Sequence, residues 1–188
     1  MIMTKTILIV TAHPSSHGFT HMLAKHIEQK ENVNHNTVEI IDLYKTQFAK
    51  EYTYFEEHPK EICEPKHIQE MQLKVQKTDE FILIAPLWNL DTPAIMKNWF
   101  DSVFTAKFAF KFTKMGMPKG LMNDKTVKMY ITCDAPSIMY KMFGNPTKKI
   151  WEKYRFGICG IKMKEFKYID TMRKKTQQQR ENILQEIY

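Results

Sequence analysis

Residues 80–104 read EFILIAPLWNLDTPAIMKNWFDSVF, and this stretch decides the expected fold. Its first part, 80–86, is an apolar run closed by a proline, which is typical of a strand buried on both faces. After a short loop, Thr92 is a candidate N-cap and Pro93 suits a first helical turn, so residues 92–104 are expected to form a helix. A buried strand followed at once by a helix indicates half of a βαβ unit.

The same alternation continues outward from this stretch in both directions. Strands are expected at 5–12, 37–43, 126–132 and 162–170, and helices at 19–29, 65–78, 146–157 and 173–187, with an irregular connection before residue 65. This order predicts one α/β domain over residues 1–188, a doubly wound five-stranded parallel sheet with helices on both faces. In such sheets ligands bind beyond the carboxyl ends of the strands, which points to the loops 13–19, 86–92 and 132–147.

Composition limits the class of protein. The chain has 188 residues, of which 43% are hydrophobic and 26% charged, as in a soluble globular protein. No apolar run approaches the roughly 20 residues that span a bilayer, and the first residues lack a signal-peptide core. The three cysteines, Cys63, Cys133 and Cys159, are widely spaced without a CxxC pair, which disfavours a disulfide framework and favours a reducing cytoplasm.

The net charge of +7 is distributed unevenly. Residues 95–188 carry 19 Lys and Arg against 8 Asp and Glu, whereas residues 1–94 carry 9 against 13. A basic half can attract nucleic acid, an acidic membrane surface or a phosphorylated ligand, or it can be a solvated face. The lysines are scattered among apolar residues without a nucleic-acid-binding motif, so a nucleic-acid partner is not expected.

The first candidate loop, HPSSHGFT at residues 13–20, leads from a strand into a helix. It matches neither the dinucleotide fingerprint nor the phosphate loop of nucleotide hydrolases, yet free backbone N–H groups at a helix N-terminus form an anion site. Ser15, Ser16 and Thr20 add hydroxyl donors, and Gly18 permits a close backbone approach. The structural alternative is that Ser16 or Thr20 merely caps the helix.

A metal site is the rival interpretation of the same loop. His13, His17 and His21 are spaced by four residues, which would suit one face of a helix. Pro14 and Gly18 interrupt any continuous helix through them, and no cysteine or carboxylate lies nearby in the sequence. We therefore expect no metal there.

The other two loops carry different side chains. After the third strand, Trp88 and Asn89 place a flat apolar surface beside amide groups, which suits a planar heterocycle, unless Trp88 only covers the core. After the fourth strand, Cys133 ends the strand without a neighbouring histidine, so it is not expected to be a nucleophile. Tyr140 follows, with a phenol available for packing or for a hydrogen bond.

Taken together, three segments resemble the NAD(P)H:quinone oxidoreductase and FMN-dependent azoreductase family of flavodoxin-like flavoproteins. The longest is APLWNLDTPAIMKNWFDSVFTAKFAF at 85–110; AHPSSHGFT at 12–20 and IT-DAPS-MY at 131–140 match the family's first and third loops. The segments occur in the family's order and span nearly the whole chain. The resemblance implies a flavodoxin-like fold and bound FMN, with NADH or NADPH as electron donor. It also implies two-electron ping-pong hydride transfer to quinone, azo or nitro compounds.

The resemblance also implies which residues act. The cofactor-binding residues would be His13, His17, Gly18, Phe19 and Thr20 in the first loop, Pro86, Leu87, Trp88, Asn89 and Leu90 in the second, and Thr132, Cys133 and Asp134 in the third. Tyr140 matches the family tyrosine near flavin and substrate, the one candidate catalytic side chain.

Members of the family are commonly homodimers in which the partner roofs the active site. Phe108, Phe110 and Phe112 lie in the matching roof segment. On the helix 92–104, two apolar ridges would serve the same assembly. One ridge is formed by Ile95, Trp99 and Val103 and the other by Met96 and Phe100, so that one can cover the sheet and the other a partner.

Three departures from the family pattern matter. Asp134 and Ala135 stand where relatives have glycines, so Asp134 either disfavours negative charge on the reduced flavin or caps the following turn through Ser137 or backbone amides. No histidine follows Tyr140, and the sequence ends at Tyr188 without the extension that longer members use around FAD, which favours FMN over FAD. The alternative function is a flavin-binding regulatory subunit of a potassium efflux channel, which this family also contains.

Overall fold

A computed structural model describes residues 4–52 and 64–187. The sheet-forming strands are β1 (Thr6–Thr11), β2 (Thr37–Asp42), β3 (Glu80–Pro86), β6 (Thr126–Thr132) and β7 (Lys162–Ile169). The main helices are α1 (Phe19–Val33), α2 (Lys66–Lys77), α3 (Ala94–Val103), α4 (Ser137–Met142) and α7 (Gln177–Ile187). Cys63 and much of the expected irregular connection lie outside the described residues; Cys133 and Cys159 are free and buried.

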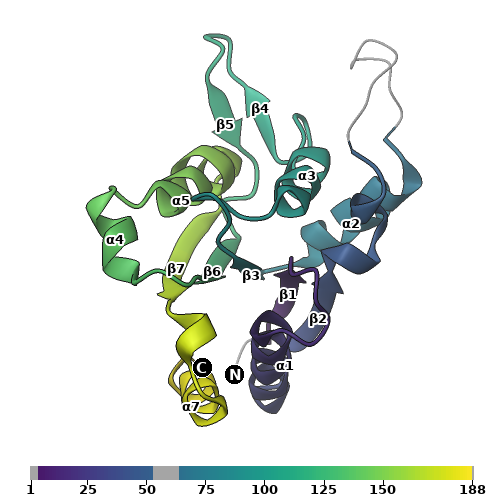
Figure 1. The fold of residues 1–188 in the computed structure, drawn as a ribbon. Coiled ribbons are helices and arrows are strands. Elements are labelled where there is room, and N and C mark those ends of the chain that lie inside the picture. Colours follow the sequence, from purple (N-terminus) through teal and green to yellow (C-terminus); the bar gives the residue numbers. More distant parts are fainter. Residues whose placement is uncertain (1–3, 53–63, 188) are drawn as a thin grey trace.

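The five strands form one parallel sheet in the order β2-β1-β3-β6-β7 (Figure 1). The prediction of a five-stranded, doubly wound α/β fold is therefore confirmed. The strand order reverses between β1 and β3, because β2 lies outside β1 on one side and the later strands follow β3 on the other. The carboxyl ends of these two central strands border the crevice where ligands of such sheets bind.

Helices cover both faces of the sheet. Figure 1 shows α1 and α7 on one face and α2 and α3 on the other. The strands alternate between two apolar cores accordingly: Leu8 and Val10 of β1 face the α2–α3 side, whereas Ile7 and Ile9 face α1 and α7. Because the central strands are apolar toward both layers, β3 is buried along its whole length and β1 at every residue but Thr6.

A long helical segment follows α4. It consists of α5 (Pro146–Lys149), a π-helical part η3 (Ile150–Phe156) and α6 (Gly157–Cys159), close to the predicted helix 146–157. This segment packs beside α3, where Phe100 meets Trp151 with ring centroids 5.6 Å apart. Both apolar ridges of α3 are consequently buried inside the chain, including Met96 and Phe100. The expectation that one of the two ridges covers a partner is wrong, because the chain's own π-helical segment packs against Phe100.

The start of α3 also differs from expectation. The helix begins at Ala94, with Pro93 as an extended N-cap residue and without a side-chain cap, so Thr92 is not the N-cap. The Thr92 backbone N–H instead donates to Asp91 Oδ1 at 2.7 Å. Pro93 itself supplies the fixed backbone angle from which the helix starts.

Short elements complete the chain. Strands β4 (Phe110–Phe112) and β5 (Pro118–Gly120) form an antiparallel hairpin that projects beyond the α3 layer (Figure 1). The 3₁₀ turns are η1 (Leu43–Lys45), η2 (Gln47–Ala49) and η4 (Met172–Lys174). Among the described residues, no helix combines the length and the apolar character needed to cross a bilayer.

Candidate functional site

A cavity of about 320 Å³ lies at the carboxyl ends of β1, β3 and β6. It brings together nine of the predicted cofactor-binding residues: His13, Phe19, Thr20, Pro86, Leu87, Trp88, Thr132, Cys133 and Asp134. Four others, His17, Gly18, Asn89 and Leu90, do not line it. The lining is completed by Met172, Arg173 and Arg180, which sequence reasoning missed.

The first loop delivers an uncapped helix end to this cavity. Gly18 is the N-cap residue of α1, in an extended conformation and with no side-chain cap, so the alternative that Ser16 or Thr20 caps the helix is wrong. The His21 N–H donates to Gly18 O at 3.0 Å, whereas the N–H groups of Phe19 and Thr20 precede the first intrahelical hydrogen bond, and their dipoles favour an anion. Thr20 is buried and lines the cavity directly behind them. This end of the cavity therefore suits a phosphate group.

Gly18 contributes indirectly, through His13. A Cβ atom at Gly18 would lie 3.1 Å from the His13 ring, so glycine is what lets that ring lie against the loop. The ring is held further by the Ser15 backbone N–H, 3.1 Å from His13 Nδ1. His13 thereby forms a wall of the cavity, whereas His17 is exposed outside it.

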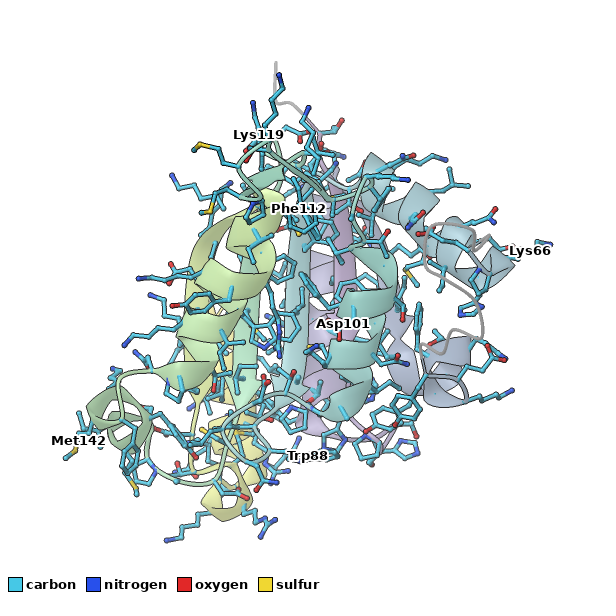
Figure 2. All side chains as sticks on the ribbon, turned by 90° about the horizontal axis from the view of Figure 1, so that it is seen from above. Lys66, Trp88, Asp101, Phe112, Lys119 and Met142 are labelled. Carbon is cyan, nitrogen blue, oxygen red and sulfur yellow. The ribbon has the colours of Figure 1, made fainter. Side chains whose placement is uncertain are left out.

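The second loop is a tight turn stabilised at both ends. The Trp88 N–H donates to Asp91 O at 2.8 Å, and the Asp91 N–H donates to Trp88 O at 3.0 Å. Asn89 and Leu90 between them have positive φ angles of 48° and 65°. Trp88 is 45% exposed, so the alternative that it only covers the core is wrong. Figure 2 shows it at the edge of the molecule, where its indole offers a flat apolar surface.

The third loop is joined to the segment after β7 by an ion pair. Arg173 Nε lies 2.8 Å from Asp134 Oδ2, and the Arg173 backbone N–H donates to Asp134 Oδ1 at 3.2 Å. Ser137, the partner expected if Asp134 capped its own turn, instead donates its backbone N–H to Asp170 Oδ2 at 2.7 Å. Asp134 therefore connects two loops at the cavity rim.

Cys133 lies at the base of the cavity as a neutral thiol. Burial raises its pKa to about 11, and its Sγ is 3.6 Å from Ala135 O. A thiol with this pKa holds its proton at neutral pH and is a poor nucleophile. The structure supports the interpretation of Cys133 as a wall residue.

Tyr140 does not line the cavity. Its ring lies against Tyr168 of β7, with centroids 5.0 Å apart, and burial raises the pKa of its phenol. The catalytic role suggested for Tyr140 therefore stays a prediction.

Arg180 is the most informative residue that sequence reasoning missed. Its Nη2 donates to Met172 O at 3.1 Å, whereas its buried Nε has no hydrogen-bond partner among the described residues. A buried guanidinium donor left unpaired at a cavity wall fits an acceptor oxygen of a ligand. The carboxyl end of β7 meets the same end of the sheet and brings residues 170–180 to it, although no local pattern in the sequence singles out Arg180.

The histidines of the first loop do not assemble with other ligands. His13 and His21 contact each other edge to face, with centroids 6.4 Å apart. Within residues 4–52 and 64–187, no three His, Cys, Asp or Glu side chains come together as a metal site would require. The polar groups of the cavity include hydroxyls, two arginines, the His13 imidazole, the Cys133 thiol and the Asp134 carboxylate, beside the indole of Trp88.

The comparison with protein families agrees with this architecture. The family described as "Flavodoxin-like fold" matches residues 5–188, nearly the whole chain. The chain belongs to the flavodoxin-like fold family.

Relatives of this flavodoxin-like chain include two curated bacterial proteins. An uncharacterized NAD(P)H oxidoreductase of Haemophilus influenzae is 32% identical over 163 residues, covering 85% of this chain and 80% of the relative. The FMN-dependent NADH:quinone oxidoreductase 2 of Bacillus subtilis is 31% identical over 137 residues, covering 63% of this chain and 64% of the relative, just under two thirds of its length.

Among solved structures, an NAD(P)H:quinone oxidoreductase from Methanothermobacter marburgensis superposes with a TM-score of 0.81. It is 22% identical, and the match covers 98% of this chain and 92% of that one. At this identity the likeness supports the flavodoxin-like fold alone.

Proposed function

We propose that this protein is an FMN-dependent NAD(P)H oxidoreductase that reduces quinones, azo compounds or nitro compounds. The observation that supports it most is one cavity that combines an uncapped helix end, an exposed indole and a buried Arg180 donor without a partner among the described residues. The names of the curated relatives support the same activity. The potassium-channel alternative has no support among the proteins named above.

The residues of the cavity fit a flavin mononucleotide. The N-terminus of α1 and the Thr20 hydroxyl would hold its phosphate, and Arg180 Nε would donate to an acceptor oxygen of the cofactor. Backbone groups of Pro86–Leu87 and the face of Trp88 would border the ring, together with Thr132 and Cys133. Different residues would thus contact the phosphate, an acceptor oxygen and the ring of the cofactor. This match between the cavity and the parts of the molecule supports FMN as the ligand.

When bound, the flavin supplies the hydride chemistry between the nicotinamide and the electron acceptor. The chain's own part is to bind, orient and shield. The apolar side chains of Phe19, Leu87 and Met172 line the cavity and would exclude water from one side of a bound ring. The Cys133 thiol keeps its proton and adds no charge at its base. Tyr140 lies outside the cavity lining but beside the lining residue Cys133, and a hydrogen bond from its phenol to flavin or substrate is part of the proposal.

The test is a titration of the purified apoprotein with FMN, followed by a steady-state assay. We expect a protected flavin absorption spectrum, release of FMN identified by mass, and oxidation of NADH or NADPH that depends on menadione. Release of FAD alone would contradict the FMN assignment. Bound flavin without any menadione reduction would favour a regulatory subunit, and no flavin binding would overturn the proposal.

We further propose that the protein is a homodimer. Its support is a set of exposed apolar side chains on α4 and the β4–β5 hairpin: Ile138, Met139, Met142, Phe143, Phe112, Met115 and Met117. In Figure 2, Phe112 lies at the opposite end of the molecule from Trp88, so within its own chain it does not roof the cavity. A roof formed by Phe112 would have to belong to a second copy. Sedimentation equilibrium measures this directly, and a monomer at micromolar concentration would contradict it.

A cytoplasmic location is proposed with the activity. Cys133 and Cys159 are buried free thiols whose pKa values burial raises to about 11 and about 12. Such thiols persist in a reducing compartment, where NADH and NADPH are also supplied. Fractionation of cells with an antibody against the protein would test the location.

A further inference from the structure

The turn between Trp88 and Asp91 adopts a conformation that its sequence does not favour. A two-residue turn with positive φ at both central positions prefers Asn followed by Gly. Here Asn89 occupies the first position, but Leu90 occupies the second, with φ of 65°. A left-handed leucine suffers a steric contact between its Cβ and the backbone that glycine avoids. Leu90 is 43% exposed, so burial of its side chain does not offset this cost.

Three buried side chains of one helical segment hold the turn in place, and we call Thr147, Trp151 and Arg155 the turn clamp. Thr147 Oγ1 donates to Leu90 O at 2.7 Å. Trp151 Nε1 donates to Asp91 Oδ1 at 3.1 Å. Arg155 donates from Nη1 to Asp91 Oδ1 at 3.2 Å and from Nη2 to Oδ2 at 2.9 Å, a bidentate pair.

The helical geometry of the segment places the three turn-clamp residues on the same face. They are four residues apart, and they pass from α5 into the π-helical η3. A step of four residues overshoots a full turn of an α-helix and falls short of a full turn of the wider π-helix. The two deviations have opposite signs, so all three side chains face the turn.

The pair between Arg155 and Asp91 is also enclosed. The Arg155 guanidinium lies 4.2 Å from the centroid of the Trp151 ring, and Arg155 as a whole is 9% exposed. Burial raises the pKa of Asp91, but the hydrogen bonds from Arg155 and the Thr92 N–H outweigh it and hold that pKa below 3.8. Both groups are charged at neutral pH, and removing either would leave the other buried without its partner.

We propose that Arg155 is a positioning residue for flavin recognition, which acts through Asp91 to hold the 88–91 turn in its left-handed form. The inference rests on the proposed function. Leu87 and Trp88 line the cavity, whereas Asn89, Leu90 and Arg155 do not. The turn clamp therefore sets where Trp88 and the adjoining backbone meet the ring, from a position behind the cavity wall.

The first experiment compares Arg155→Met with Lys97→Met in the full-length protein. Lys97 forms an exposed ion pair with Asp101 on α3, so its variant also removes one cation without touching the turn. FMN is titrated into each apoprotein, and folding is checked by circular dichroism and thermal melting. We expect FMN affinity at least tenfold weaker for Arg155→Met and within twofold of wild type for Lys97→Met.

The second experiment separates positioning from general stability. Adding Leu90→Gly to Arg155→Met restores the favoured Asn-Gly turn, which adopts the left-handed form without the clamp. We expect the double variant to reverse at least half of the change in log Kd for FMN that Arg155→Met causes. A purely structural role of Arg155 would give no recovery. If Arg155→Met does not fold, Arg155→Lys, which keeps the charge and loses the bidentate geometry, takes its place in the same pair of measurements.

A measurement on the apoprotein, without FMN, tests the positioning role of Arg155 independently of the proposed oxidoreductase activity. Acrylamide quenching of tryptophan emission in the apoprotein reports the exposure of Trp88, and it should change in Arg155→Met and return with Leu90→Gly. If wild type binds no FMN but the quenching changes in Arg155→Met and returns with Leu90→Gly, the proposed flavin-dependent activity is wrong. The role of Arg155 in positioning the turn is then still supported. A folded Arg155→Met protein with wild-type quenching and FMN affinity within twofold overturns the proposal.

Discussion

Asp134 and Arg173 form an ion pair that connects the loop after β6 to the segment after β7, with Nε and Oδ2 2.8 Å apart. The side chains are 48% and 88% exposed, so solvent screens the pair and its contribution to stability is small. Its position matters more, because both residues line the cavity. The Asp134 carboxylate at the cavity rim is thus accompanied by a cation.

The first prediction concerns the flavin midpoint potential. Reduced flavin carries negative charge, so Asp134→Asn should raise the potential and Arg173→Gln should lower it. A unit charge about 6 Å away in water-like surroundings contributes roughly 0.7 kcal/mol, or about 15 mV for a two-electron couple. Spectroelectrochemistry measures both variants, with Lys97→Gln as a surface control. Unchanged potentials in both would mean that the pair does not face the ring.

The second prediction tests the phosphate site. Thr20→Val keeps the shape of a side chain that is 1% exposed but removes its hydroxyl. A hydrogen bond to a charged group contributes about 1.5–3 kcal/mol, so FMN affinity should fall roughly 10- to 100-fold.

Riboflavin, which lacks the phosphate, provides the control for Thr20→Val and should bind both proteins equally. Thr11→Val is the matched variant, because Thr11 is also buried but donates to Ile41 O outside the cavity. Equal loss for FMN and riboflavin would place the Thr20 hydroxyl away from the phosphate. Isothermal titration of wild type and both variants with FMN and with riboflavin gives these affinities.

The third prediction uses the unequal exposure of the three tryptophans. Trp99 and Trp151 are fully buried and Trp88 is 45% exposed, so acrylamide should quench mainly Trp88 in the apoprotein. Bound FMN should remove this accessible component, and Trp88→Phe should lack it from the start. An accessible fraction that FMN leaves unchanged would show that the ring does not lie against Trp88.

The fourth prediction concerns the stability contributed by Glu80, the first residue of β3, at the end of the strand away from the cavity. Glu80, whose side chain is 2% exposed, lies 3.0 Å from Lys128 and 3.5 Å from both Lys5 and Lys164. Glu80→Gln should lower the free energy of unfolding by about 1–3 kcal/mol in urea at pH 7, because it leaves the lysine charges around a neutral amide. Glu39→Gln removes the exposed pair with Lys74 and should cost about 0–1 kcal/mol. Equal losses of unfolding free energy in Glu80→Gln and Glu39→Gln would show that burial does not strengthen the Glu80 ion pairs.

The stabilisation by Glu80 should also depend on pH. Burial raises the pKa of Glu80, but the lysines, Lys128 foremost, outweigh it and the pKa falls below 4.5. A lowered carboxyl pKa gives stability that is present above pH 4.5 and lost as the pH falls through the folded-state value. The difference between wild type and Glu80→Gln should therefore narrow below about pH 4.5, and a constant difference would contradict the assignment.

The sequence predicted the sheet well because its strands are either apolar runs, as in β3, or alternate between apolar and polar residues, as in the first half of β6. Residues 80–86 and 126–132 coincide with β3 and β6. The hairpin β4–β5 and helix α4 escaped prediction, since segments of three to six residues are too short for their periodicity to show. Thr92 failed as a cap because its backbone serves Asp91 instead.

The sequence predicted those parts of the candidate site that come directly after the strands. His13, Trp88 and Cys133 each follow a strand of the central sheet, and they meet in one cavity. Arg173 and Arg180 reach that cavity from η4 and α7, and no local pattern marks them. Nor does any pattern in the sequence link Asp91 to Arg155, because that pair depends on how two helices pack against the sheet.

The strand order carries a kinetic consequence for the folding chain. β1 is synthesised first, yet its inner neighbour β3 begins at Glu80, and every pairing in the main sheet is parallel and therefore non-local. Such topologies fold slowly, because long loops must close before their contacts form. Until β3 arrives, the apolar edge of β1 stays open to other chains, which makes this interval the point of greatest aggregation risk. Refolding yield should consequently fall as protein concentration rises.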